Sequence, residues 1–120
     1  MSTESDRVAE LLPLPPATFH ILLALIDQDR HGYAIIQDVE ARTKGALRMS
    51  AGTLYRSIAR MVQQGLVAEV AKRRTATDDA RRRYYRLTPL GGRVVAAEIR
   101  RLQALVSSPS VRALVRRWAT

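Results

Sequence analysis

The sequence predicts a mainly α-helical protein with one small β-hairpin. Three stretches repeat apolar residues with the period of a helix, two alternate polar and apolar residues like strands, and a long stretch is again helical. Three helices followed by a hairpin is the order of a winged helix-turn-helix. We therefore expect a polar N-terminal lead over residues 1–15, a winged helix over 16–88, a dimerisation helix over 89–106 and a short amphipathic tail helix over 107–120.

The first helix of the winged domain is expected over Ala17–Gln28. Prolines prevent a continuous helix before it, and the last of them suits a first helical turn: Pro13, Pro15 and Pro16. Its apolar face is expected to contain Ile21, Leu22, Leu25 and Ile26. The preceding lead is predicted to be either disordered or a short helix around Val8–Leu12.

The second helix is expected over Tyr33–Arg42, after a polar turn at Asp27–Arg30. His31, just before this helix, is expected to be a cap or a core-edge residue in preference to a ligand. The third helix is expected to begin behind Ser50, whose hydroxyl can accept from free N–H groups of the first turn, and to stop at Gly65. Its buried stripe is expected to be Leu54, Ile58 and Met61, spaced i, i+4, i+7.

The opposite stripe of the third helix carries hydroxyls and guanidinium groups and no acidic residue: Thr53, Arg56, Ser57 and Arg60. Such a helix presents hydrogen-bond donors to a negative partner, which suits the edges of bases in a DNA major groove. One of the two arginines can read a guanine while the other contacts a phosphate. The alternative for this stripe is an ordinary solvated face.

Residues around the starts of the second and third helices are further candidates for DNA contact. Gly52 would let the helix end approach the DNA backbone, or is only a poor helix former tolerated near the cap formed by Ser50. The ring of Tyr55 is expected beside the core with its hydroxyl near a phosphate. For Tyr33, phosphate contact and packing are equally expected.

The predicted hairpin pairs Leu66–Arg74 with Arg82–Thr88. Six cations flank its tip: Lys72, Arg73, Arg74, Arg81, Arg82 and Arg83. They would repel one another unless an anion is supplied, so contact with phosphates or the minor groove is favoured over a solvated face. Tyr85 and Leu87 are expected to point inward, and Tyr84 outward.

The long C-terminal helix begins at Thr88-Pro89, a cap followed by a proline in the first turn. Its apolar residues follow coiled-coil spacing and are interpreted as a dimer seam: Val95, Ile99, Leu102 and Val106. The alternative is packing against the first helix of the same chain. In the tail helix, Val111–Trp118, the tryptophan is expected mainly to pack.

Charge and composition restrict the partners and the chemistry. The net charge of the 120 residues is +9, and residues 66–120 supply all of it, with thirteen Lys and Arg against four Asp and Glu. Such a half binds polyanions whatever its sequence preference. The chain has no cysteine and two histidines, so no cofactor or metal is expected. No apolar run approaches the roughly 18 residues of a membrane span, and a cytoplasmic, nucleoid-associated protein is expected.

Several short motifs together resemble the PadR family of bacterial transcriptional regulators. They are His31–Tyr33, Gly52–Tyr55, Gly65–Val67, Arg81–Thr88 and Gly91, in the family's order and at similar spacing. The resemblance implies a homodimer that represses or modulates genes, often in response to a small hydrophobic molecule, and it is closest to members with one C-terminal dimerisation helix. The chain departs from the family pattern at two places, Gly92 directly after Gly91 and the tail after Ser107. Both departures concern the expected geometry of the dimer and not the expected DNA contacts.

The leading interpretation is a homodimeric repressor that binds an inverted repeat in double-stranded DNA with sequence specificity. The alternative is a winged helix that binds nucleic acid without specificity, as in an architectural or RNA-associated protein. The chain has six aromatic residues, few for a protein that reads RNA by base stacking. An enzyme is not expected, because no histidine stands near a serine or carboxylate by spacing and no phosphate-binding loop is present.

Overall fold

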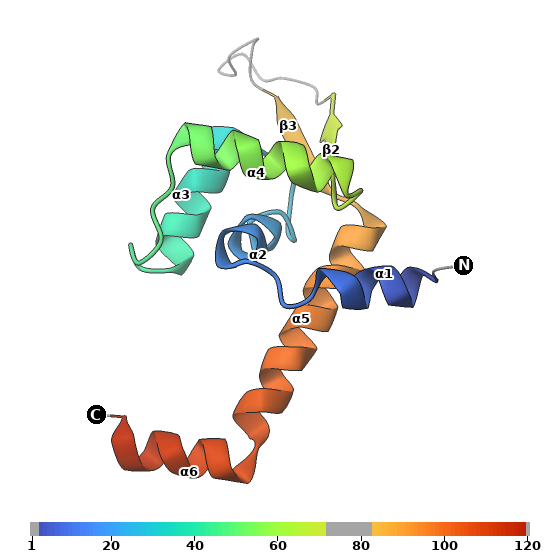
Figure 1. The fold of residues 1–120 in the computed structure, drawn as a ribbon. Coiled ribbons are helices and arrows are strands. Elements are labelled where there is room, and N and C mark those ends of the chain that lie inside the picture. Colours follow the sequence, from blue (N-terminus) through green and yellow to red (C-terminus); the bar gives the residue numbers. More distant parts are fainter. Residues whose placement is uncertain (1–2, 72–82, 120) are drawn as a thin grey trace.

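The computed structural model describes residues 3–71 and 83–119. In chain order its elements are α1 (Glu4–Leu11), α2 (Pro16–Leu23), β1 (Arg30–His31), α3 (Gly32–Arg42), α4 (Ala51–Gln63), β2 (Val67–Val70), β3 (Tyr84–Leu87), α5 (Pro89–Ser107) and α6 (Pro109–Trp118). Helices α2, α3 and α4 gather beside a small sheet, α5 leads away from them, and α6 turns off the far end of α5 (Figure 1). The predicted winged helix-turn-helix is confirmed.

The core lies between α2, α3, α4, the sheet and the first half of α5. The buried stripe predicted for the third helix is confirmed, since Leu54, Ile58 and Met61 are at most 3% exposed. Buried side chains from the other elements complete the core, among them Ile21, Leu22, Ile35, Val39, Leu66, Val67 and Val94. Continuous burial of these apolar side chains is the main force that holds the helices together.

Four of the helix starts, that of α1 among them, are fixed by side-chain caps. The backbone N–H of Thr53 donates to the Ser50 hydroxyl at 3.2 Å, as predicted. His31 is a cap as well, because its Nδ1 accepts from the N–H of Ala34 at 3.2 Å. Thr88 caps α5. Gly65, with φ of +79°, ends α4 in the left-handed region that glycine adopts without strain.

The helix predicted over Ala17–Gln28 is wrong at its C-terminal end, because α2 stops at Leu23. The carbonyl of Ala24 accepts from Arg30 Nε at 2.7 Å, and the chain turns there toward the sheet. Ile26, predicted to face inward, is 48% exposed as a result. The sequence predicted a longer helix because the apolar spacing continues to Ile26, beyond the turn at Ala24.

The sheet has three strands in the order β1-β3-β2, and both pairings are antiparallel. The hairpin of β2 and β3 was predicted, but β1 lies in what was expected to be a polar turn. Asp29, which directly precedes β1, joins this edge strand to β3. Its carboxylate accepts from Nε and Nη2 of Arg86 on β3 at 3.1 and 2.9 Å. A two-residue strand has no periodicity of its own, so only pairing with β3 reveals it.

Tyr84 corrects the prediction that it points outward. It is 9% exposed, and its ring meets His31, its partner on β1, edge to face at a centroid distance of 5.4 Å. Tyr85, as predicted, is buried. Adjacent residues of a strand point to opposite faces of the sheet, and both Tyr84 and Tyr85 are buried, so both faces of β3 are covered at this point.

The N-terminal lead is a helix over most of its described length. Thr3 and Asp6 form a reciprocal capping box at its start, so the helix begins four residues before the expected Val8. It lies beside α5 (Figure 1), and Val8, Leu11 and Leu12 pack against the core.

Helix α5 has a buried first half and an exposed second half. Val95 is 4% exposed within its own chain, which corrects its assignment to the dimer seam, and Ile99 is partly buried against the same core. The alternative, packing within the chain, holds for these two positions. Leu102 and Val106 are 37% and 61% exposed, so the seam remains a prediction there.

Buried Glu98 attaches α5 to the segment between α1 and α2. Its carboxylate accepts from the N–H of Leu14 at 2.7 Å and from Nε of Arg101 at 2.5 Å. The hydrogen bond from Arg101 lowers the pKa of Glu98, which outweighs the opposite effect of burial. The ionised carboxylate therefore satisfies a backbone N–H that the two prolines beside it leave without a helical partner.

The tail helix was predicted, and α6 begins two residues earlier than Val111. Trp118 is 69% exposed, so it does not pack over the core of its own chain. In the described part of the chain, no helix combines the length and the apolar character that crossing a bilayer requires.

Candidate nucleic-acid interface

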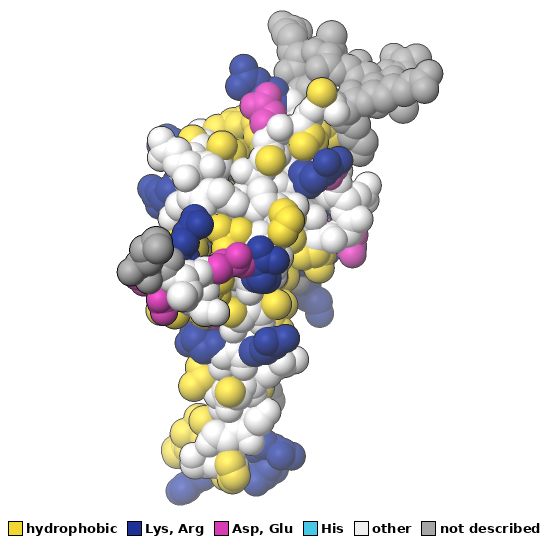
Figure 2. Space-filling view, turned by 90° about the vertical axis from the view of Figure 1, so that its right-hand side faces the viewer, with side chains coloured by type: hydrophobic (Ala, Val, Ile, Leu, Met, Phe, Trp, Pro, Cys, Tyr) yellow, Lys and Arg dark blue, Asp and Glu magenta, His cyan; other side chains and the backbone are white. Residues whose placement is uncertain are grey.

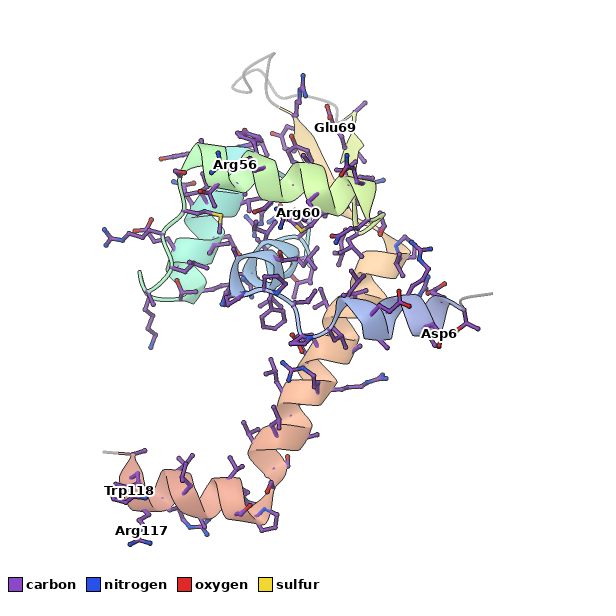
Figure 3. The ribbon with its side chains drawn as sticks, viewed as in Figure 1. Asp6, Arg56, Arg60, Glu69, Arg117 and Trp118 are labelled. Atoms are coloured by element: carbon purple, nitrogen blue, oxygen red, sulfur yellow. The ribbon has the colours of Figure 1, made fainter. Side chains whose placement is uncertain are left out.

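The outward face of α4 is open to solvent from its cap to its last turn. Ser50, Gly52, Tyr55, Arg56 and Arg60 are exposed, while Thr53 and Ser57 are half-buried. Arg56 and Arg60 stand one turn apart on this helix (Figure 3). Opposite them, Leu54, Ile58 and Met61 fix the helix to the core, so the direction of the polar stripe is set by packing.

A short polar network orders the start of this stripe. The hydroxyl of Ser50 donates to Oγ1 of Thr53 at 3.1 Å, and Nη2 of Arg56 donates to the same oxygen at 3.4 Å. The guanidinium of Arg56 thus lies over the first turn of α4, where free backbone N–H groups also point outward. Hydroxyl, amide and guanidinium donors converge at this end of the helix.

The two arginines of α4 differ from most others in the structure. Within residues 3–71 and 83–119, no carboxylate forms an ion pair with Arg56 or Arg60. Seven other arginines do have acidic partners: Arg30, Arg42, Arg48, Arg83, Arg86, Arg93 and Arg101. The charge on α4 is therefore available to an external anion.

Tyr55 has a packing role that sequence reasoning only partly identified. Its ring lies across Gly32 at the start of α3, where an added Cβ would be 2.8 Å from Cζ of the tyrosine. Any larger residue than glycine at position 32 would displace the ring. Tyr55 is nevertheless 48% exposed, and Tyr33, in the first turn of α3, is 61% exposed. Both rings remain accessible at the junction of α3 and α4.

The sheet flanks the C-terminal half of α4 (Figure 1). Of the six predicted wing cations, Arg83 is described, and its Nε lies 3.7 Å from Oε1 of Glu69 on β2. Lys72, Arg73, Arg74, Arg81 and Arg82 lie outside the described residues. Burial raises the pKa of the Tyr85 hydroxyl behind this pair, and Glu69 adds to the shift, so the phenol is neutral at physiological pH.

A hollow of about 450 Å³ separates α4 from the sheet. Ala59 and Val62 line it from α4, opposite Glu69, and neither was among the predicted site residues. Ala59 and Gln63 also follow Arg56 at i+3 and i+7 and are exposed, so helical spacing places them on its face. The sequence analysis missed Ala59 and Gln63 because neither carries a charge, although their helical spacing from Arg56 could have identified them.

Metal-binding clusters are missing from the described residues, where no three His, Asp or Glu side chains come together. The site offers exposed donors on a helix without acids, beside a small sheet. These features suit binding of an anionic polymer.

The sequence profile of the "Transcriptional regulator PadR-like family" matches residues 21–97, from α2 into α5. The chain belongs to this family. The motifs that carried the resemblance all lie within this match, and they include the first turns of α3 and α4. Membership in a family of transcriptional regulators agrees with the prediction that the chain is not an enzyme.

An uncharacterized protein from Lysinibacillus sphaericus is 32% identical over 71 residues, which are 59% of this chain and 63% of that protein. The chain therefore matches less than two-thirds of that relative's length.

Solved structures share the fold. A transcriptional regulator from Clostridium thermocellum has a TM-score of 0.64 at 21% identity, over 99% of this chain and 100% of that one. A complex structure of RosR from H. salinarum has a TM-score of 0.67 at 25% identity, over 93% and 91% of the two chains. Bacillus subtilis PadR in complex with operator DNA has a TM-score of 0.60 at 15% identity, over 72% and 48%.

Proposed function

We propose that the chain is a repressor that binds double-stranded operator DNA with sequence specificity and acts as a homodimer. The observation that carries the proposal is the outward stripe of α4, whose two arginines have no acidic partner among the described residues. A helix of 13 residues is about 20 Å long, enough to lie along a major groove.

In this proposal different residues of the site contact different parts of the DNA. Arg56, near the start of α4, reads a guanine edge, and Arg60 contacts the phosphate backbone. Ser50, Thr53 and Ser57 donate to phosphates or base edges, and the close approach of the helix end is possible because Gly52 has no side chain. Tyr33 and Tyr55 add phosphate contacts beside them.

The wing supplies contacts that do not depend on sequence. Its cations contact phosphates or the minor groove beside the major groove that α4 occupies: Lys72, Arg73, Arg74, Arg81, Arg82 and Arg83. Such contacts release counterions and make the affinity fall with salt concentration. Specificity then rests on α4, and a large part of the affinity rests on the wing.

A homodimer would double this arrangement about a two-fold axis. Its two α4 helices would enter successive major grooves about 34–36 Å apart, so the operator would be an inverted repeat. The exposed end of α5, with Leu102 and Val106, supports the dimer contact. Cytoplasmic location and release by a small hydrophobic molecule also belong to the proposal, and both come from the family resemblance and composition.

The test is a competition experiment with the promoter region upstream of the protein's own coding sequence. We expect footprinting to reveal a protected inverted repeat, and an excess of random duplex to compete at least 1,000-fold less well than the promoter. Equal binding of promoter and random duplex would instead favour the non-specific winged-helix protein. A reporter gene behind the same promoter should be expressed more strongly when the protein is absent.

Variants separate the two kinds of contact. Arg56→Ala should relax the preference at one base position, whereas Arg82→Ala should weaken binding to all sequences alike and reduce the salt slope by about one.

Release of a labelled promoter fragment by a panel of hydrophobic molecules would identify an effector, and a failure across the panel would count against that part of the proposal.

A further inference from the structure

Helix α5 contacts the body of the molecule, defined as α1 to α4 and the sheet, along its first half only. The last of its buried residues is Glu98, and from Leu102 onward its large apolar side chains are exposed. In Figure 2 the second half of α5 and α6 extend below the body as a narrow region with hydrophobic and basic side chains. The direction in which they project is therefore set by the way the first half of α5 is attached.

Two polar attachment points determine the direction of α5 relative to α4. The first is at the start of α5, where Oγ1 of Thr88 donates to the carbonyl of Gly65, the residue that ends α4, at 2.6 Å. The second is Glu98, which lies about 15 Å further along the helix at a rise of about 1.5 Å per residue. Together with the buried side chains of Val94 and Val95 between them, these two points fix the axis of the helix.

The carboxylate of Glu98 connects α5 to a stiff segment of the body. Its Oε2 accepts from the N–H of Leu14 at 2.7 Å, and its Oε1 accepts from Nε of Arg101 at 2.5 Å. Leu14 stands between Pro13 and Pro15, whose rings restrict the backbone, and its own side chain is buried in the core. Arg101, one turn further along α5, holds the carboxylate in the orientation that reaches this segment.

A charge at this position contributes direction more than it contributes stability. Glu98 is 2% exposed, and it is the one charged residue that is buried among those the structure describes. Removing a carboxylate from water is costly even beside a cation, and an apolar side chain of similar size often stabilises such a site as well or better. Apolar contacts are non-directional, however, whereas a hydrogen bond weakens steeply as its angle departs from linearity. The two hydrogen bonds of Glu98 therefore define how α5 is turned relative to the body.

The direction of α5 matters for DNA binding because α4 belongs to the body, whereas the exposed end of α5 supports the proposed dimer contact. A rotation of the body about Glu98 would move α4 relative to the two-fold axis. One base pair shifts a half-site by about 3.4 Å and turns it by about 35° around the duplex. A loose attachment at Glu98 would therefore let the two α4 helices bind half-sites at several spacings.

We propose that Glu98 is a positioning residue that fixes the separation and relative orientation of the two α4 helices, and thus the half-site spacing that the protein accepts. It acts through its hydrogen bonds with Leu14 and Arg101 and does not contact DNA. This role rests on the homodimer and the inverted repeat of the proposed function, and it names the residue that sets the geometry of both.

Distances between spin labels test the attachment in the absence of DNA. The chain has no cysteine, so Gln37→Cys places one label on an exposed position of α3 in each protomer. Pulsed electron spin resonance of the dimer then gives the distribution of distances between the two bodies. We expect this distribution to become about twice as wide when Glu98→Leu removes both acceptor oxygens. An equal width with and without Glu98→Leu, or labels that show no dimer, would overturn the proposal.

Two acid-to-amide variants supply a matched comparison. Glu98→Gln keeps the shape of the side chain and one acceptor oxygen, so it should widen the distribution less than Glu98→Leu, and it decides the question if the leucine variant does not fold. Glu4→Gln removes the ion pair between Glu4 and Arg93, a half-exposed contact that also joins α1 to α5, and should leave the width unchanged. Equal widening by the two amide variants would contradict a particular role of the buried carboxylate.

Operators with altered spacing supply the functional test. The affinity for the native inverted repeat is compared with the affinity for repeats that have one base pair more or fewer between the half-sites. We expect the unmodified chain to prefer the native spacing about 30-fold, and Glu98→Leu to reduce this preference about tenfold. Binding to a duplex with a single half-site should change less than about threefold, since no DNA contact is removed. A folded Glu98→Leu dimer that keeps the unmodified preference would overturn the proposal.

A core variant controls for lost stability in the spacing experiment. Val39→Ala removes buried methyl groups from α3, away from the attachment of α5, and should destabilise the body. We expect it to keep the spacing preference of the unmodified chain. A preference reduced as much by Val39→Ala as by Glu98→Leu would show that loss of stability, and not loss of positioning, is the cause.

The outcomes also separate this inference from the proposed function. A dimer that prefers its promoter but shows the same spacing preference and label distances after Glu98→Leu contradicts the positioning role alone. A dimer whose label distances depend on Glu98, but which binds promoter and random duplex equally, contradicts the specific repressor alone.

Discussion

The outward face of α4 and the C-terminal arm, residues 102–119, are both exposed, basic and without acidic residues, but they differ in what lies between their arginines. On α4 the arginines alternate with short hydroxyls and a glycine, and the apolar side of the helix is buried. In the arm the arginines flank large apolar side chains that are exposed. Short donors beside cations suit phosphates and base edges, whereas apolar stripes beside cations suit another protein surface. Exposure and charge alone therefore do not distinguish a DNA contact from a protein contact.

The largest change in the free energy of unfolding that we expect is at Gly91, in the first turn of α5, the helix that connects the two regions. A Cβ at Gly91 would lie far inside contact distance of the Leu66 carbonyl oxygen and 2.8 Å from Cδ1 of Leu87. Gly91→Ala should lower the free energy of unfolding by about 3 kcal/mol, because backbone atoms must shift. Urea denaturation measures this change.

Gly92 is the matched control for that substitution. Its Cβ would find an ordinary contact with Leu87 at 3.9 Å, and its backbone is helical. Gly92→Ala should raise the free energy of unfolding by up to about 1 kcal/mol, as the helix propensity of alanine predicts. Similar destabilisation by both substitutions would contradict the close approach of α5 to the Leu66 carbonyl at Gly91.

The second prediction compares arginines from the two regions. Arg56→Ala should weaken binding to the operator by about 2 kcal/mol and relax the preference at one base pair. Arg112→Ala, in the arm, should leave the ratio of promoter to random-duplex affinity unchanged. Fluorescence anisotropy with both duplexes measures the two quantities. If Arg112→Ala reduced that ratio as much as Arg56→Ala, the division between the surfaces would be wrong.

The third prediction concerns the carboxylate that ties α5 to the body. The pKa of Glu98 is held below its ordinary value near 4.5 by the hydrogen bond from Arg101, opposed by burial. Its stabilising contribution is therefore fully present above that value and is lost as the pH falls through the lower folded-state pKa. Glu98→Gln should cost about 1 kcal/mol at pH 7, and this difference should shrink below pH 4.5.

Urea titrations at several pH values measure the contribution of Glu98. Arg101→Gln should remove part of the same pH dependence, because Arg101 is the main cause of the shift. A difference between the unmodified chain and Glu98→Gln that does not vary with pH would contradict ionisation of Glu98 as its source.

The last prediction compares the starts of α4 and α6, and it includes the smallest effect that we expect, at Ser108. Ser50→Ala should lower the free energy of unfolding by about 1 kcal/mol, because the Thr53 N–H loses its acceptor. Ser108→Ala should change it by less than about 0.5 kcal/mol, since the Ser108 side chain forms no cap on α6. Thermal unfolding of both variants checks the ranking, and a larger effect at Ser108 would contradict it.

Local patterns were sufficient for the elements that have clear periods and caps. Ser50, the Leu54–Met61 stripe and Gly65 together defined α4, because a cap, a buried spacing and a left-handed stop each act within a few residues. The same patterns indicated which face of α4 carries the candidate site. Ala59 and Val62 escaped notice, since apolar residues beside the sheet do not differ in sequence from ordinary surface residues.

The sequence by itself determined where α4 and α5 begin, which residues of α4 are buried, and the family to which the chain belongs. Each of these depends on hydrogen bonds within one turn, on periodic burial, or on short motifs. Only the tertiary structure decided that α2 stops at Leu23, that Tyr84 is buried beside His31 of β1, and that Val95 belongs to the core while Leu102 does not. These outcomes depend on contacts between residues far apart in the chain, and a helical stripe has the same spacing whether its own body or another molecule covers it.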